Sequence, residues 1–278
     1  MINAVGNRMM IEINRQQSLA RAISDTQISI STGKKIQRAS DDPVAAARIA
    51  AIGRSQANSK AWSVNLDTGL SLNSQADTAI SGMADRLALS RQLLLAGANG
   101  AVTQADRDTL ATQLDGIADE LDALAGRRSA NGQPLFSTTT ALNVRYDANT
   151  IFAPVPSRTE VFDVGGVSLS QTVRDAATAL RGGAAVAIGA LLTTLDSGIT
   201  KTANALGDIG QRGQRLQSLR EASRAQDIDL AVERSELEST DISEAIALLN
   251  AQTLTLDAAQ AAFARINRRT LLDRKSVV

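Results

Sequence analysis

Two short motifs near the N-terminus combine residue types that could bind an anion or a metal. Residues 31–35 (STGKK) contain the Gly-Lys step of a phosphate-binding loop, and Asp41-Asp42 places two carboxylates side by side. The loop motif also requires a glycine five residues before its Gly-Lys glycine and Ser or Thr after the lysine, where this chain has Ile28 and Lys35. We therefore predict that Gly33 ends a helix beside the two lysines, and that Asp42 caps the next helix.

The other candidate chemistry is also weak. Asp115, Asp119, Glu120 and Asp122 form an acidic stretch on a helix whose other side is apolar, which favours a solvated face over a metal site. The chain contains no Cys and no His, so it lacks the commonest general base and the commonest metal ligand. We expect no enzymatic activity, no cofactor and no bound metal.

Helices must position most of these residues. The four prolines all lie between Pro43 and Pro156, so neither end of the chain has a proline that would break a helix. Apolar spacing, capping residues and glycines predict helices over about 3–31, 43–95 and 103–126, and again from Ser168 onward, interrupted at Gly182-Gly183.

The second of these helices carries an apolar residue at nearly every seventh position, a spacing typical of a seam with other helices. Ser59 and Asn73 interrupt this register with polar side chains. We expect the helix to pack lengthwise in an antiparallel bundle, with the following helix folded back on it. The apolar members of the register are Ile52, Leu66, Ile80, Leu87 and Leu94.

The middle of the chain has the alternating pattern of short strands. Asn131-Gly132 is a hairpin-turn dipeptide, and Leu142, Val144 and Tyr146 alternate with polar residues. We predict a small β-rich insert over residues 131–167. Because the insert lies at mid-sequence, we expect it at the end of the bundle farthest from the two termini.

Both ends of the chain repeat the seven-residue apolar spacing, and Asp241 with Glu244 predicts a capping box that starts the last helix. A narrow apolar seam left in water is unstable, so we expect the end helices to pair with each other, with neighbouring copies, or both. The predicted subunit-interface residues are Ile2, Met9, Ile13, Ile23 and Ile30 in the first helix and Ile242, Ile246, Leu249, Leu256 and Phe263 in the last.

Composition agrees with thin helices rather than a thick core, because only 2% of the residues are aromatic. The balance of 29 basic and 29 acidic residues gives no electrostatic case for nucleic acid, and no apolar run is long enough for membrane insertion. We predict a mainly α fold, a long antiparallel helical bundle or coiled-coil rod with a small β-rich insert at mid-sequence. The expected segments are an N-terminal coiled-coil assembly helix (1–35), a helical rod in two parts (36–130 and 168–238), the insert (131–167) and a C-terminal coiled-coil assembly helix (239–278).

Several motifs resemble the bacterial flagellin superfamily. Residues 31–36 (STGKKI) followed by 39–46 (ASDDPVAA) are similar to its N-terminal signature, and residues 131–136 (NGQPLF) resemble the turn that starts its β region. The C-terminal seam is also similar to that of flagellins. Within the superfamily, residues 40–43 (SDDP) and Met9-Met10 are more similar to the hook–filament junction branch, the third hook-associated proteins, whereas residues 274–278 depart from both branches.

This resemblance implies a structural subunit of the flagellum that lies outside the cell, exported unfolded by the flagellar type III route without a cleaved signal. The N-terminal residues, Met1 to Arg15, also lack the apolar region of such a signal. The implied partners are copies of the chain itself, the adjacent axial proteins (a hook-associated protein and flagellin) and an export chaperone. The terminal helices are then segments that fold on assembly.

Two other classes stay open. A filament-forming flagellin, major or minor, would build long filaments, and a cytoplasmic coiled-coil scaffold would have ordered termini and no β insert. Near the C-terminus a group of basic residues allows nucleic-acid binding, but without aromatic residues for base stacking we favour contacts with acidic residues of neighbouring subunits. That group is Arg265, Arg268, Arg269, Arg274 and Lys275.

Overall fold

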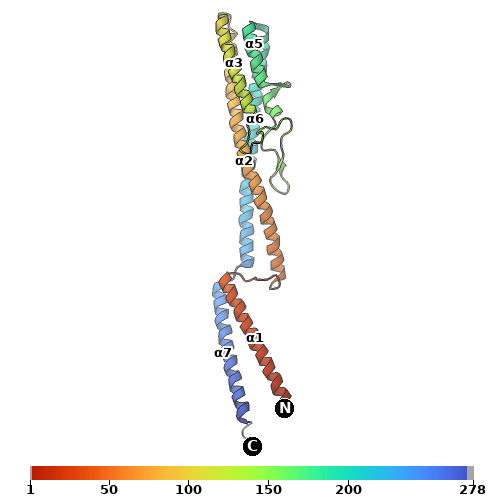
Figure 1. Cartoon of the computed structure of the whole chain (residues 1–278), viewed down its shortest axis with the longest axis vertical. Coiled ribbons are helices and arrows are strands. Elements are labelled where there is room, and N and C mark those ends of the chain that lie inside the picture. The colour runs from red at the N-terminus through yellow and green to blue at the C-terminus, as the bar shows by residue number, and fades with distance from the viewer. Residues whose placement is uncertain (1, 184, 274–278) are drawn as a thin grey trace. The chain divides into compact units, whose positions relative to one another are not determined.

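The computed structural model describes the backbone of residues 2–183 and 185–273, and the side chains of residues 9–183 and 185–265 (Figure 1). The described backbone is dominated by helices, with four strands of two residues each, which confirms the mainly α fold. The helices are α1 (Ile2–Thr32), α2 (Pro43–Gly97), α3 (Gln104–Ala125), α4 (Arg158–Phe162), α5 (Leu169–Gly182), α6 (Ala185–Glu238) and α7 (Ile242–Asp273). The strands are β1 (Val144–Arg145), β2 (Ile151–Phe152), β3 (Asp163–Val164) and β4 (Val167–Ser168).

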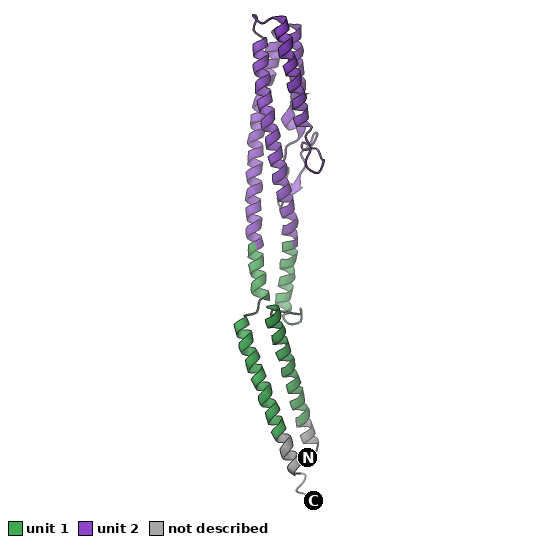
Figure 2. Ribbon diagram, turned by 60° about the vertical axis from the view of Figure 1, so that its left-hand side comes forward, with its two compact units in different colours: residues 1–56, 228–278 green, residues 57–227 purple. Residues whose placement is uncertain are grey.

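The chain divides into two compact units, which are coloured separately in Figure 2. The first unit combines the two ends of the chain, residues 1–56 and 228–278, and the second comprises residues 57–227. The first unit therefore contains α1, α7, the start of α2 and the end of α6, and the second contains everything between.

Helix ends follow the predicted capping residues closely. The Asp42 carboxylate accepts hydrogen bonds from the backbone N–H of Val44 (3.1 Å) and Ala45 (2.9 Å), which satisfies two amides at the start of α2. Thr103 caps α3 in the same way through the N–H of Asp106 (3.2 Å). Gly183 ends α5 with φ of 64°, a left-handed conformation that glycine adopts without steric cost.

The second unit is a bundle of α2, α3, α5 and α6. Its helices α2 and α3 are antiparallel, because Arg86 pairs with Glu120 at 2.5 Å while Gly97, farther along α2, lies against Leu110 at the start of α3. The expected fold-back of α3 is therefore confirmed. Helix α5 also packs along α3, where Arg181 pairs with Asp115 at 2.5 Å.

All members of the seven-residue register in α2 are buried, including the two polar ones. The Ser59 hydroxyl lies 3.3 Å from the hydroxyl of Ser223 in α6. Asn73 donates from Nδ2 to the carbonyl oxygens of Pro154 (3.0 Å) and Ile209 (3.1 Å). The polar interruptions are thus positions where α2 hydrogen-bonds to α6 and to the insert, as buried amides and hydroxyls require.

The insert is less regular than predicted. Its strands form two short antiparallel hairpins, β1–β2 and β3–β4, and most of the remaining residues are turns and irregular chain. The predicted turn at Asn131-Gly132 is present, with Gly132 at φ of 75° and its N–H donating to Ser129 O at 2.9 Å.

The predicted place of the insert, at the end of the bundle, is wrong. Asn65 of α2 donates to Arg145 O at 2.8 Å, and Tyr146 is buried against α2 and α6, so the insert lies along the side of these helices (Figure 1). The reason is the length of α3, which carries the chain back along α2 until Leu124 lies beside Gly82. The insert therefore begins partway along the bundle.

Candidate assembly interface

Helices α1 and α7, which carry the predicted interface residues, pack against each other within the first unit. Thr26 is buried, and its hydroxyl donates to Ala22 O (2.9 Å) and lies 3.1 Å from Gln252 Oε1 across the pair. Because Gly33 pairs with Thr240 while Thr26 pairs with Gln252, the two helices are antiparallel. Pairing of the two ends of the chain, one of the expected alternatives, is therefore present within a single chain.

The pairing covers only part of each predicted seam. Ile23, Ile30, Leu249, Leu256 and Phe263 are half-buried. By contrast, Met9 and Ile13 of α1 and Ile242 and Ile246 of α7 are exposed, and the side chain of Ile2 lies outside the described residues.

Several further apolar side chains of these helices are exposed at positions that the seven-residue register does not include. On α1, Met10 is 67% and Ile11 61% exposed, and on α7 Leu254 is 71% exposed. Ile28 and Leu248 belong to the same group. A test for apolar residues beyond a single seven-residue seam would have found them, because they widen the apolar stripe of each helix.

Where α1 and α6 end, the two chain segments are joined by backbone hydrogen bonds. Lys35 N–H donates to Glu238 O (2.8 Å) and Thr240 N–H donates to Gly33 O (3.0 Å). Gly33 makes the turn with φ of 68°. We call this contact between residues 33–35 and 238–240 the joint. It fixes the end of α1 to the start of α7.

The two lysines of the joint act on a different helix from the predicted one. We expected Lys34 and Lys35 to meet the end of α1, but Lys34 Nζ pairs with the Glu238 carboxylate (3.1 Å) and Lys35 Nζ donates to Glu236 O (3.3 Å), both at the end of α6. Left-handed Gly33 turns the chain away from α1, so the carbonyl end of α6 receives the positive charge. Residues 31–35 do not form a phosphate-binding loop, because the glycine of such a loop opens a helix, whereas Gly33 follows one.

Glu238 is the central charged group of the joint. Its side chain is only 16% exposed and also pairs with Arg234 at 2.7 Å. The hydrogen bond from Arg234, together with that from Lys34, holds the pKa of the Glu238 carboxyl below its usual range.

The Asp41-Asp42 motif holds the linker between α1 and α2 and is not a metal pair. Asp41 Oδ2 accepts hydrogen bonds from the backbone N–H of Arg38 (2.7 Å) and Gln37 (3.0 Å), which lower the pKa of its carboxyl. With Asp42 capping α2, both carboxylates are used by backbone amides. Among the described residues, no three acidic side chains gather closely enough to hold a metal ion.

Acidic side chains of α3 form ion pairs with arginines of α5, whereas we expected a solvated face. Arg174 of α5 lies 2.9 Å from Asp119 and 2.6 Å from Asp122, and Ser170 donates to Asp122 at 2.7 Å. These ion pairs are partly exposed and stabilise the packing of α5 on α3 only modestly. Burial alone would raise the pKa of the Asp122 carboxyl, but its hydrogen bonds with Ser170 and Arg174 together outweigh that effect and lower the pKa.

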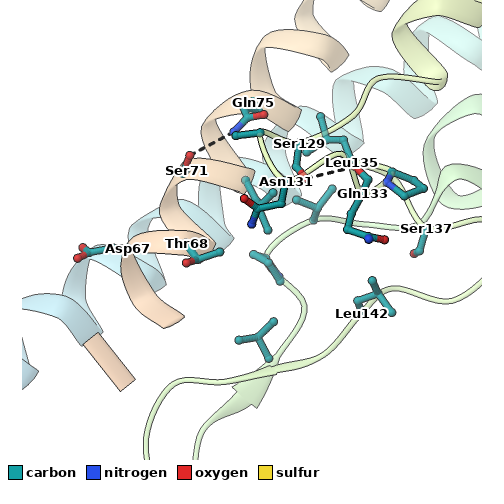
Figure 3. Close-up of a pocket in the computed structure, with 16 residues that line it drawn as sticks. Asp67, Thr68, Ser71, Gln75, Ser129, Asn131, Gln133, Leu135, Ser137 and Leu142 are labelled. Carbon is teal, nitrogen blue, oxygen red and sulfur yellow. Dashed lines mark hydrogen bonds between the residues drawn. The ribbon is translucent and has the colours of Figure 1, made fainter. Parts of the chain in front are cut away.

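A hollow of about 500 Å³ lies in the second unit between α2 and the insert. Figure 3 shows Thr68, Ser71 and Gln75 of α2 on one side of it, and Asn131 and Leu142 of the insert on the other. Its lining combines hydroxyl, amide and apolar groups. The carboxylate of Asp67, also in the lining, is paired with Arg220 at 3.1 Å. The described lining thus holds no pair of groups suited to acid–base chemistry.

Comparison with known proteins identifies the family. The model of the bacterial flagellin N-terminal helical region matches residues 3–141, half of the chain. The chain belongs to the bacterial flagellin family. The matched residues comprise most of α1, all of α2 and α3, and the first part of the insert, so they include the α1 half of the candidate interface.

The curated relatives of this flagellin-family chain come from two kinds of flagellar protein. Flagellar hook-associated protein 3 of Salmonella typhimurium is 28% identical over 153 residues, which cover 55% of this chain and 45% of the relative. Flagellin of Listeria monocytogenes is 26% identical over 136 residues, covering 48% of this chain and 47% of the relative. The chain therefore spans less than half the length of these relatives.

A solved structure supports the fold. Flagellar hook-associated protein 3 of Legionella pneumophila superposes with a TM-score of 0.61 over 68% of this chain and 98% of its own, at 13% identity. At that identity the likeness shows the fold alone.

No described helix combines the length and the apolarity needed to cross a membrane. In the predicted basic group only Arg265 has a described side chain, and the side chains of the other four members lie outside the described residues.

Proposed function

We propose that the protein is a structural, non-enzymatic subunit of the bacterial flagellum at the hook–filament junction, and that it assembles through α1 and α7. The observation that carries this proposal is the exposure of large apolar side chains on both helices after they have paired. The described examples are Met9, Met10, Ile11, Ile13 and Ile28 on α1 and Ile242, Ile246, Leu248 and Leu254 on α7. Two-helix pairing leaves these side chains in water, whereas neighbouring subunits would bury them.

Assembly is then driven by burial of these side chains between copies of the chain. Each apolar Å² removed from water contributes about 25 cal/mol, which must offset the loss of conformational freedom on ordering the helices. One partner helix covers one side only, so several copies must meet before the stripe is covered. In this proposal residues 1–35 and 239–278 are the assembly segments, residues 36–130 and 168–238 are the bundle that stacks outside them, and residues 131–167 are the insert.

The partners follow from this function. The proposed neighbours are further copies of the chain, a hook-associated protein on one side and flagellin on the other, with an export chaperone before assembly. Support comes from the relatives named as hook-associated protein 3 and flagellin. Export by the flagellar type III route without a cleaved signal, and a final place outside the cell, belong to the same proposal.

A filament-forming flagellin is the second candidate, because the family model and one of the relatives are those of flagellin. The SDDP sequence at residues 40–43 favours the junction protein. Family membership argues against the cytoplasmic coiled-coil scaffold.

Immunogold labelling of isolated flagella separates the two flagellar candidates. An antibody against this chain should label a short band at the hook end of each filament. Labelling along the whole filament would replace the junction proposal with the flagellin one. Absence of label from the flagellum in expressing cells would contradict both.

A further inference from the structure

The β1–β2 hairpin is held to the helices by one main side chain, Tyr146. This side chain is 1% exposed and forms a small apolar cluster with Leu66 of α2 and Leu216 of α6, separate from the main core of the bundle. Its ring lies 4.7 Å from the ring of Phe152, which stands opposite Val144 on the other strand of the hairpin. Tyr146 thus acts as the anchor that inserts the hairpin between the two helices.

The hydroxyl of this anchor has no described hydrogen-bond partner. Tyr146 Oη is buried, and none of the residues whose side chains are described hydrogen-bonds to it; burial raises the pKa of the phenol to about 12. A hydroxyl that loses its water on burial without gaining a partner destabilises the buried state. The hydroxyl therefore opposes the docking that the ring favours.

Val144 and Phe152 also pack against this cluster, and three polar or charged contacts add to the docking. Asn65 donates to Arg145 O (2.8 Å), Arg212 donates to Ala153 O (2.7 Å), and the Arg215 guanidinium lies 4.5 Å from the centre of the Phe152 ring. Within the hairpin, Tyr146 N–H donates to Thr150 O (3.0 Å), but a two-stranded hairpin this short is only marginally stable alone, so undocking exposes its amides to exchange.

From these contacts we propose that residues 143–153 form a releasable strap, which undocks from α2 and α6 while both helices stay folded. The unpartnered hydroxyl of Tyr146 sets how easily the strap is released. Release uncovers Leu66 and Leu216 and removes Val144 from the wall of the hollow in Figure 3, so it joins two apolar surfaces that are separate in the docked state.

Hydrogen exchange on the full chain tests this proposal, followed by mass spectrometry of the peptide covering residues 143–153. In the wild-type chain this peptide should exchange through openings that leave the flanking parts of α2 and α6 protected. Tyr146→Phe removes the unpartnered hydroxyl and keeps the ring, so exchange of the strap should slow about 5-fold or more. Exchange that is equally fast or faster in Y146F, or opening of strap and helices together in the wild type, would overturn the proposal.

Gly69 of α2 supplies a second variant with a matched control. A Cβ at Gly69 would lie 2.8 Å from Tyr146 Oη and 3.0 Å from Cε1, whereas a Cβ at Gly53 of the same helix meets nothing within 4 Å. Both Gly→Ala changes favour the helix equally by propensity, but only Gly69→Ala should speed exchange of the strap. The effect of G69A should shrink in the Y146F background, because the closest contact, with the hydroxyl oxygen, is gone. Equal effects of G69A and G53A on the strap would contradict the proposal.

Discussion

At the scale of single residues, the polar members of the apolar register in α2 are the ones that best show how this helix is aligned with its neighbours. Asn73 interrupts the register of α2, is buried, and donates from one amide group to the carbonyl oxygens of Pro154 and Ile209. A buried amide between two segments specifies their alignment, because any shift along the helix would leave it unpaired. Gly213 of α6 allows the close approach, since a Cβ there would lie 2.8 Å from Asn73 Oδ1.

Replacement of Asn73 by Ala should therefore destabilise the second unit. The substitution removes the donor to Pro154 O and one of the two donors to Ile209 O, whose helix bond remains, and we expect a loss of about 1–3 kcal/mol in the free energy of unfolding. Urea unfolding followed by circular dichroism measures it. Ser74→Ala, at the exposed neighbouring position, is the control and should change stability by less than about 0.5 kcal/mol. Equal stability of N73A and S74A would show that the amide does not hold the insert to the helices.

At the scale of elements, the joint couples the end of α6 to the end of α1 through Glu238. Its carboxylate receives Arg234 and Lys34, and its backbone oxygen receives the N–H of Lys35. Because these partners lower the folded-state pKa from its ordinary value of 4.5, they stabilise the joint above that value, and the stabilisation is lost as the pH falls through the lowered pKa.

The corresponding variant is Glu238→Gln, with Glu236→Gln, an exposed neighbour of the same charge, as its control. At neutral pH we expect the amides of Lys35 and Thr240 to exchange roughly two- to five-fold faster in E238Q, because partly exposed ion pairs are worth little more than that. The difference from the wild type should vanish at pH values below the lowered pKa of Glu238. If the difference persisted at that pH, or if E236Q had an equal effect, the ion pairs of Glu238 would not stabilise the joint, and its backbone hydrogen bonds alone would hold it.

The exposed apolar residues of α1 should act on assembly and not on folding of the subunit. Met10 and Ile11 are mostly exposed, so the double change to Ser should leave the melting temperature nearly unchanged. Each side chain buried between subunits contributes about 1.5–3 kcal/mol, so incorporation into flagella should fall at least tenfold. The measurement compares variant protein in purified flagella with variant protein exported into the medium, which separates assembly from export.

Val186→Ser is the matched control for this variant. Val186 is also exposed, but it belongs to the start of α6 in the second unit and not to α1 or α7. V186S should be incorporated like the wild type. Equal incorporation of the M10S/I11S variant and V186S would remove these residues from the interface.

At the scale of the whole molecule, the sequence predicted elements better than their placement. Caps and glycines such as Asp42, Thr103 and Gly183 act through their own backbone and nearest amides, so the helix ends were predictable. The place of the insert depends on where α3 stops beside α2, and on a tyrosine that fits against a glycine of α2, which are contacts between distant residues. The action of Lys34 on α6 was missed for the same reason. The predicted interface on α1 and α7 stays a prediction, because its partners are other chains.

The same division between local and distant contacts leads to a test of the complete chain. The main core cluster draws all its buried members from residues 76–209, so neither α1 nor α7 contributes to it. A chain reduced to residues 33–241 should therefore remain folded, with cooperative melting close to that of the full chain by circular dichroism. When this trimmed chain is mixed in vitro with wild-type subunits at the growing end of a flagellum, we expect it not to be incorporated. Both proposed assembly helices are missing from it. If the trimmed chain were incorporated as well as the full one, assembly would have to depend on the bundle instead, and the exposed side chains of α1 and α7 would need another explanation.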